Sequence, residues 1–191
     1  MAEDRRITRT KLLIKQSFLQ LLDKKNLDEI SIKEITDGAM CNRNTFYLHY
    51  TDKYDLMNRL CKDALETTSS ELNKLYNRSY SSYEDMYLIV PRKCLELMEK
   101  DFEFYRIVLG KNRYPQFYEK YKETMVNLSL HSIPANQRNS KKKRLEIEYA
   151  THGLIGIHKY WLLNHEHISK EEILTLSKDL ILSMGKLMHE K

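Results

Sequence analysis

Four residues in the first third of the chain carry side chains that can bind the edges of DNA bases or phosphates: Arg43, Asn44, Thr45 and Tyr47. An arginine can bind guanine through two hydrogen bonds, and a threonine can pack its methyl group on thymine. Hydroxyl groups also bind backbone phosphates, which fixes the register of a protein on the duplex. The spacing of these residues suits a segment, 42–49, that enters a major groove.

The element that must hold these side chains is a short helix. Asn42 is a good N-cap, and the helix that it begins extends over about 43–48. Phe46 can anchor one side of it against the rest of the protein. Because a helix of barely two turns is not stable alone, its neighbours must fix it in place. This is how a recognition helix is presented to a groove.

The segment just before it predicts a second short helix. Ser31 and Glu34 have the spacing of a capping box, in which each side chain accepts from the other residue's backbone N–H. Gly38 ends this helix. The stretch 31–53 is therefore read as a helix-turn-helix followed at once by a third helix.

A further helix is expected upstream, over about 8–24, where apolar residues recur at helical spacing. Five basic residues and no acidic one occupy 5–15, which opposes the helix dipole. Contact with phosphates would explain that arrangement. A solvated tail without a partner is the alternative.

The stretch from Ile35 to Leu56 strongly resembles the DNA-binding signature of TetR/AcrR-type bacterial regulators. The resemblance lies in Thr45-Phe46-Tyr47, in the aromatic Tyr50, and in Lys53 followed by Leu56. It implies a three-helix N-terminal DNA-binding domain, a connecting helix, and a larger helical C-terminal domain that dimerises and often binds a small ligand. The stretch 153–163 also looks like the C-terminal domain of such regulators from Firmicutes.

By this resemblance, Arg43 binds guanine, Thr45 contacts a thymine methyl or a phosphate, and Tyr47 and His49 contact phosphates. Helix N-termini would contribute backbone N–H groups to further phosphates. The N-terminal arginines would follow the minor groove or the backbone. The expected DNA-binding residues are Arg5, Arg6, Ser31, Asn42, Arg43, Asn44, Thr45, Tyr47, His49 and Lys53.

The turn between the two short helices departs from the family pattern. Met40 stands where the family usually has glycine, and Cys41 and Asn42 replace the usual valine and serine. Asn42 retains the capping chemistry. A turn position with positive φ disfavours a long side chain, so either the turn is altered or Met40 is strained.

The composition predicts an all-α fold of about nine helices. Of 191 residues, 41% are hydrophobic, and only five are glycine and three proline. The polar break at 77–82 is the best boundary. We divide the chain into a DNA-binding domain (1–50), a connecting helix (51–76) and a dimerisation and ligand-binding domain (77–191).

The last two helices, over about 141–164 and 169–190, are the expected pairing surface of a homodimer. Two such helices from each subunit would form a four-helix interface. Glycines on the first would let another helix approach closely. The alternative is that both helices close a monomer core. The expected interface residues are Gly153, Gly156, Ile157, Trp161, Leu180, Met184 and Leu187.

Many of the thirteen tyrosines lie between 76 and 121, where they could line a ligand cavity. Aromatic residues at helical spacing are, however, more often plain core packing. If a cavity exists, its expected lining is Phe104, Tyr105, Phe117, Tyr121 and His152.

Other chemistries have little support. The net charge of +5 permits nucleic-acid binding without demonstrating it. The three cysteines are widely spaced, no acid–base pair or phosphate loop appears, and no apolar run approaches a membrane span. We expect no cofactor, no metal, no enzymatic activity and no membrane partner.

The expected protein is a cytoplasmic, homodimeric transcriptional regulator, and a repressor is preferred to an activator. It is expected to bind a palindromic or nearly palindromic double-stranded operator and an unknown small-molecule effector. An activator or co-regulator controlled by a protein partner is the alternative. A helical enzyme is the reading that the sequence favours least.

Overall fold

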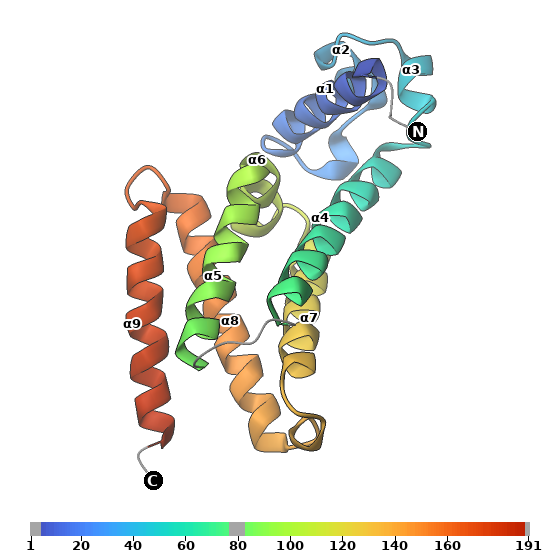
Figure 1. Cartoon of the computed structure of the whole chain (residues 1–191). Coiled ribbons are helices and arrows are strands. Elements are labelled where there is room, and N and C mark those ends of the chain that lie inside the picture. Colours follow the sequence, from blue (N-terminus) through green and yellow to red (C-terminus); the bar gives the residue numbers. More distant parts are fainter. Residues whose placement is uncertain (1–4, 77–82, 190–191) are drawn as a thin grey trace. The chain divides into compact units, whose positions relative to one another are not determined.

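The computed structural model describes residues 5–76 and 83–189, and the side chains of 5–76 and 89–180. These ranges contain helices and connections and no strand, which confirms the all-α prediction (Figure 1). No helix in them is long and apolar enough to span a bilayer. The elements are α1 (Arg5–Leu22), η1 (Leu27–Glu29), α2 (Ile32–Gly38), α3 (Arg43–Tyr47), α4 (Lys53–Tyr76), α5 (Tyr83–Lys100), α6 (Phe102–Tyr105), η2 (Arg106–Gly110), α7 (Pro115–Ser132), η3 (Ala135–Gln137), α8 (Lys141–Asn164) and α9 (Lys170–His189).

The chain divides into two compact units, Met1–Asp63 (unit 1) and Ala64–Lys191 (unit 2). The boundary falls inside α4, which is one continuous helix. This differs from the predicted division, which treated 51–76 as a separate connector. The first eleven residues of α4 belong with the DNA-binding helices, and the remainder belongs with unit 2.

Unit 1 is built by α1 packing on α2 and by α2 packing on α3. The interior side of α1 buries Ile14, Phe18 and Leu22 completely, and Ile35 of α2 and Phe46 of α3 are equally inaccessible. Since these side chains come from three helices, the short α2 and α3 are held by tertiary packing, as their length requires. The predicted helix-turn-helix is therefore present.

Two residues at the end of α2 explain the unusual turn. The N–H of Met40 donates to the Asp37 carbonyl (3.2 Å) and that of Cys41 to the Thr36 carbonyl (3.0 Å), which is a Schellman C-cap. Met40 has a φ of 51° and an 85% exposed side chain. The cap that usually takes glycine is intact, and Met40 is strained.

Gly38 is required by the packing of α1 on α2 and not by the turn. A Cβ atom built there would lie 2.3 Å from Ser17 Oγ. Ser17 is buried and donates a 2.8 Å hydrogen bond to the Ile35 carbonyl. Glycine at 38 thus allows α1 and α2 to approach closely.

Replacing Met40 with glycine is expected to stabilise unit 1 by about 1 kcal/mol, because a non-glycine residue in the left-handed region carries strain and this exposed side chain loses no packing. Hydrogen exchange of the α2 and α3 amides measures the change. Met40→Ala is the matched control, since it keeps the Cβ atom and the strain. Equal protection in the glycine and alanine variants would contradict the explanation.

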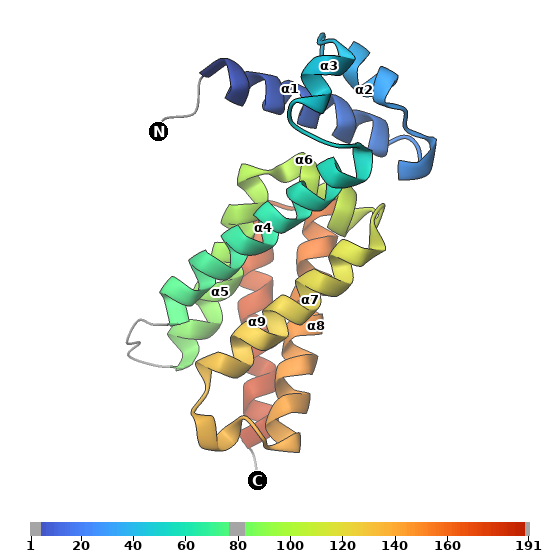
Figure 2. The same cartoon turned by 90° about the vertical axis from the view of Figure 1, so that its right-hand side faces the viewer.

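Unit 2 is a helical bundle in which α7 lies beside α8, while α5 and α8 both pack on α9 (Figure 2). Pro91 lies inside α5 without ending it. The π-helical segment η2 packs against α7 and α8, and a Cβ atom on Gly110 would meet Leu162 and Leu163 at 3.3–3.4 Å. The interior of unit 2 also takes Thr68 and Leu72 from the second half of α4.

Candidate DNA-binding surface

The start of α3 is fixed by hydrogen bonds within its own first turn. Asn42 Oδ1 accepts from the Thr45 N–H (2.7 Å) and from the Thr45 hydroxyl (3.0 Å). The predicted N-cap is therefore confirmed. Because the hydroxyl of Thr45 already donates to Asn42, a DNA contact by Thr45 is left to its methyl group or to the oxygen as an acceptor.

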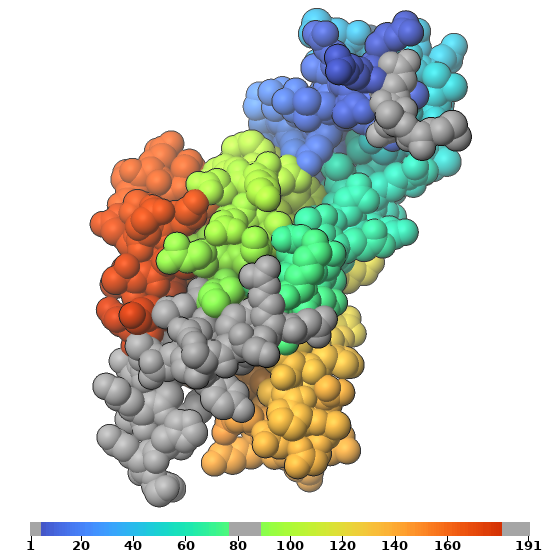
Figure 3. Space-filling view, in the orientation of Figure 1, coloured from blue at the N-terminus to red at the C-terminus, as the bar shows by residue number. Residues whose placement is uncertain are grey.

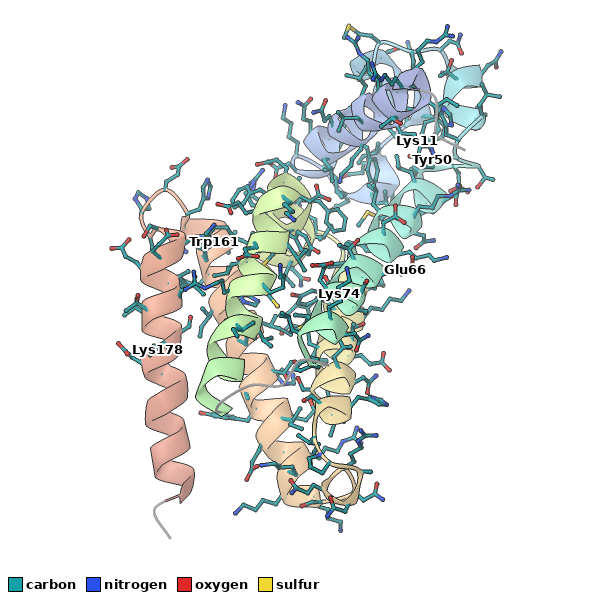
Figure 4. All side chains as sticks on the ribbon, in the orientation of Figure 1. Lys11, Tyr50, Glu66, Lys74, Trp161 and Lys178 are labelled. Atoms are coloured by element: carbon teal, nitrogen blue, oxygen red, sulfur yellow. The ribbon has the colours of Figure 1, made fainter. Side chains whose placement is uncertain are left out.

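The opposite side of α3 is held by a buried aromatic ring. Phe46 is completely inaccessible, and its ring centroid lies 5.6 Å from that of Tyr47 and 5.5 Å from that of Tyr50. Lys11 of α1 lies near Tyr50, and both are labelled in Figure 4. This anchor determines which side chains of α3 remain outside.

Arg43 and Asn44 are exposed, and within the described part of the chain no residue engages their side chains. Tyr47 is 54% exposed. His49 is half-buried with its ring 6.3 Å from that of Tyr50. Arg43 and Asn44 are thus available to bases. The two predicted phosphate contacts also pack on neighbouring rings, Tyr47 on Phe46 and His49 on Tyr50.

Ser31 forms the predicted capping box with Glu34. The Glu34 N–H donates to Ser31 Oγ (3.2 Å), and the Ser31 N–H and hydroxyl donate to Glu34 Oε2 (2.9 and 2.8 Å). Lys25 Nζ lies 2.5 Å from Glu34 Oε1. The hydrogen bonds from Lys25 and Ser31 lower the pKa of Glu34 to about 2. The Ser31 N–H is therefore already occupied, which restricts this residue as a phosphate contact.

The ammonium group of Lys53 is directed at the protein itself. It donates to the carbonyls of Asp28 (2.6 Å) and Ile30 (2.8 Å), at the end of η1. Tyr54 binds the Asp28 carboxylate in the same place (2.8 Å). Lys53 thus fixes the start of α4 to the loop before α2. Lys53 was expected on phosphate because it lies at a helix N-terminus, and its carbonyl partners, 25 and 23 residues away, were not foreseeable from the local sequence.

Arg5 and Arg6 are exposed in the first turn of α1. The helix begins three residues earlier than expected, so both arginines are carried by a helix. Sequence reasoning missed one exposed residue on α3. Leu48 is 80% exposed at the C-cap. Its position four residues after Asn44, on the same side of the helix, could have indicated this exposure.

The predicted ligand-lining residues separate into two groups. Phe104, Tyr105, Phe117 and Tyr121 are at most 3% exposed, and their ring centroids lie 5.2–6.4 Å apart. We call these four residues the aromatic cluster. His152 lies elsewhere, exposed on α8, with Nδ1 2.7 Å from the Glu148 carbonyl.

The hydroxyl groups of the aromatic cluster bind polar side chains of neighbouring helices. The Tyr105 hydroxyl lies 3.4 Å from Thr68 Oγ1, and Tyr121 forms a hydrogen bond with Cys94. Burial raises the pKa of Cys94 and Tyr105 to about 12 each, and raises that of Tyr121 well above its ordinary value. These contacts are those of a packed core.

Two hollows occur elsewhere on unit 2. One, of about 180 Å³, is lined by Arg106, Lys111 and residues 162–167. The other is open, about 500 Å³, and is lined by Lys142, Leu145, Glu146 and Tyr149. Neither contains a residue of the aromatic cluster or His152.

The predicted pairing helices leave an apolar stripe uncovered. A Cβ atom on Gly153 or Gly156 would meet no atom within 4 Å, and Ile157 beside them is half-buried. Figure 3 shows the described part of α9, in red, along one edge of unit 2. The exposed stripe consists of Leu145, Tyr149, Gly153, Gly156, Tyr160 and Leu163 of α8, with Leu176 and Leu180 of α9.

Trp161 does not belong to this stripe. It is 5% exposed, and its position is labelled in Figure 4. Its ring meets that of Phe102 edge to face at 5.6 Å. We therefore assign Trp161 to the interior of unit 2 and leave it out of the pairing surface. The side chains of Met184 and Leu187 lie outside the described ones.

Comparison with known proteins identifies the class to which this fold and surface belong. Residues 85–183, just over half of the chain, match the family model for the C-terminal region of TetR transcriptional regulators. The chain therefore belongs to the TetR family of transcriptional regulators.

Among its relatives is YxbF of Bacillus subtilis, an uncharacterized helix-turn-helix transcriptional regulator, 23% identical over 110 residues. The matched stretch is 56% of this chain but only 28% of that protein.

Solved structures share the fold at low identity. A Syntrophomonas wolfei protein assigned to the TetR family has a TM-score of 0.69 at 18% identity, covering 93% of this chain and 95% of its own. The fatty acid degradation regulator FadR of Bacillus halodurans has a TM-score of 0.64 at 12% identity, covering 94% of each chain. The dihydroxyacetone kinase operon activator DhaS has a TM-score of 0.57 at 17% identity, covering 93% and 97%.

Proposed function

We propose that this protein is a homodimeric repressor that places α3 of each subunit in the major groove of a nearly palindromic operator. The observation that carries the proposal is the arrangement of α3. Phe46 is fully buried, while Arg43 and Asn44 on the same helix are exposed and unengaged. A rigid helix with free hydrogen-bonding side chains is what direct readout requires.

Arg43→Ala is expected to weaken operator binding by about 1–3 kcal/mol at fixed salt, because it removes a base-reading side chain. Fluorescence anisotropy with the duplex upstream of the protein's own gene measures this. Arg92→Ala, which removes an exposed arginine of α5, is the matched control and should bind as the wild type does. Unchanged binding by the Arg43 variant would remove this residue from the site.

The apolar stripe on α8 and α9 supports pairing through these helices. Its residues on α8 recur at intervals of three and four, so they share one side of the helix. Exposed leucines and tyrosines around two uncovered glycines form a surface on which another helix can pack closely. A two-fold arrangement would let two α3 helices meet half-sites about 34–36 Å apart.

Gly156→Lys is expected to convert the dimer to a monomer without unfolding the protomer. Within one chain a Cβ atom at this position meets nothing, and lysine forms helix more readily than glycine. In a dimer the same side chain would separate the helices. Light scattering after size exclusion measures the mass, and Glu123→Lys on the exposed side of α7 is the control. A Gly156→Lys dimer of unchanged stability would exclude this interface.

Control of operator affinity is assigned to unit 2, where an effector that binds two arrangements of the dimer unequally would shift their populations. A small molecule is the first candidate. The second candidate is a protein partner that controls an activator or co-regulator, and the packed aromatic cluster favours it. DhaS is itself described as an activator. Deleting the gene distinguishes a repressor from an activator: transcription from the bound promoter rises if the protein represses and falls if it activates.

A further inference from the structure

The outer ridge of α3 consists of Asn44 and Leu48. The Leu48 N–H donates to the Asn44 carbonyl at 3.0 Å, and Leu48 has helical dihedral angles (φ −66°, ψ −22°). The helical turn therefore continues through Leu48. Since each residue rotates by about 100° around the axis, Asn44 and Leu48 both lie on the side opposite the buried Phe46. They lie on the exposed side of α3.

The exposure of Leu48 agrees with this position. Its side chain is 80% exposed, whereas Phe46 on the opposite side is at 0%. A single exposed leucine is ordinary on a protein surface. Here, however, it lies one turn from Asn44, on the side of a recognition helix that would enter the groove deepest. Arg43, by contrast, lies nearer the flank of the helix.

The major groove offers one apolar group to such a side chain, the C5-methyl of thymine, and it offers adenine N6 and N7 to an asparagine. Side chains four residues apart on a helix are about 5–6 Å from each other, which is within the span of two neighbouring base pairs at about 3.4 Å each. We propose that Leu48 is a specificity-determining residue that contacts a thymine methyl group, next to an adenine read by Asn44. The inference rests on the proposed function and assigns neighbouring A·T pairs to each half-site.

The test uses a duplex enriched by the wild-type protein from a random-sequence pool. Each duplex of a series has one thymine replaced by deoxyuridine, which removes the methyl group and keeps the base pairing. Wild-type protein should bind one of these duplexes about four-fold more weakly, the usual effect of one buried methyl group. Leu48→Ala should weaken binding to the thymine duplex and show no further loss on the uracil duplex.

Two variants accompany this cycle. Leu48→Met retains an apolar side chain and should retain the preference for thymine. Leu12→Ala removes another exposed leucine, from α1 of the same unit, and should retain the full thymine-to-uracil ratio. Circular dichroism should be unchanged in all three, because the altered side chains are mostly exposed.

The outcomes separate the two claims. If no duplex is enriched, the proposed function and this inference both fail. If a duplex is enriched but the thymine-to-uracil ratio of Leu48→Ala equals that of the wild type, Leu48 does not read thymine, and only the inference is overturned. Loss of the ratio in Leu48→Ala alone, with the Met and Leu12 variants unaffected, supports it.

Discussion

Replacing Phe117 with alanine is expected to lower the free energy of unfolding of unit 2 by about 3–5 kcal/mol. Phe117 is completely buried, and its ring lies 5.2 Å from Phe104, 6.1 Å from Tyr105 and 5.8 Å from Tyr121. Alanine would leave a cavity at the centre of these rings, which surrounding helices fill only in part. Urea unfolding followed by tryptophan fluorescence reports on unit 2, because Trp161 is the single tryptophan of the chain.

The size of this loss also distinguishes a packed core from a ligand cavity. Side chains that line an empty cavity make fewer contacts, so truncating one would cost less. Tyr118→Ala, on the neighbouring and partly exposed residue, is the control and should cost less than about 1 kcal/mol. A loss below about 1.5 kcal/mol for Phe117→Ala would show that the aromatic cluster is loosely packed and would favour a ligand cavity there.

His158→Leu is expected to stabilise unit 2 at pH 7 by about 1–3 kcal/mol. His158 is fully buried on α8, and neither ring nitrogen has a hydrogen-bond partner among the described residues. A buried polar group without a partner loses its hydration and gains nothing in return. Leucine removes the two nitrogens and keeps a side chain of similar size.

The same residue is expected to make the wild-type protein sensitive to acid. Burial lowers the pKa of His158 from its ordinary 6.5 to about 3. Between these values the unfolded chain binds a proton that the folded protein does not, so stability is full above about pH 6.5 and is lost as the pH falls towards 3. From pH 6.5 to 4.5 the loss through this one residue is about 2–3 kcal/mol.

Comparing the wild type with His158→Leu separates the contribution of His158 to acid sensitivity from the contribution of the protein's carboxylates. Stability of the wild type and of His158→Leu is measured at pH 7 and pH 4.5 by fluorescence-detected urea unfolding. The variant should lose about 2–3 kcal/mol less on acidification. His152→Leu, on the exposed side of the same helix, should behave as the wild type. Parallel losses in all three proteins would mean that His158 is protonated while folded.

What the sequence determined by itself were the features that depend on residues close together in the chain. The capping box of Ser31 with Glu34 and the Asn42 cap of α3 are both present, because each involves partners only three residues apart. The sequence also marked Met40 as the unusual turn residue, but left open whether the turn is altered or Met40 is strained, and the φ of 51° decides for strain. Periodicity and composition were sufficient for the all-α fold.

What only the tertiary structure decided were the features that depend on partners far along the chain. Gly38 is required by Ser17, Lys53 binds the carbonyls at 28 and 30, and Trp161 turns inward onto Phe102. An aromatic residue at helical spacing has the same pattern whether it lines a cavity or fills a core. Only the packing of other helices around it decides which, because burial is a property of the folded chain and not of the local sequence.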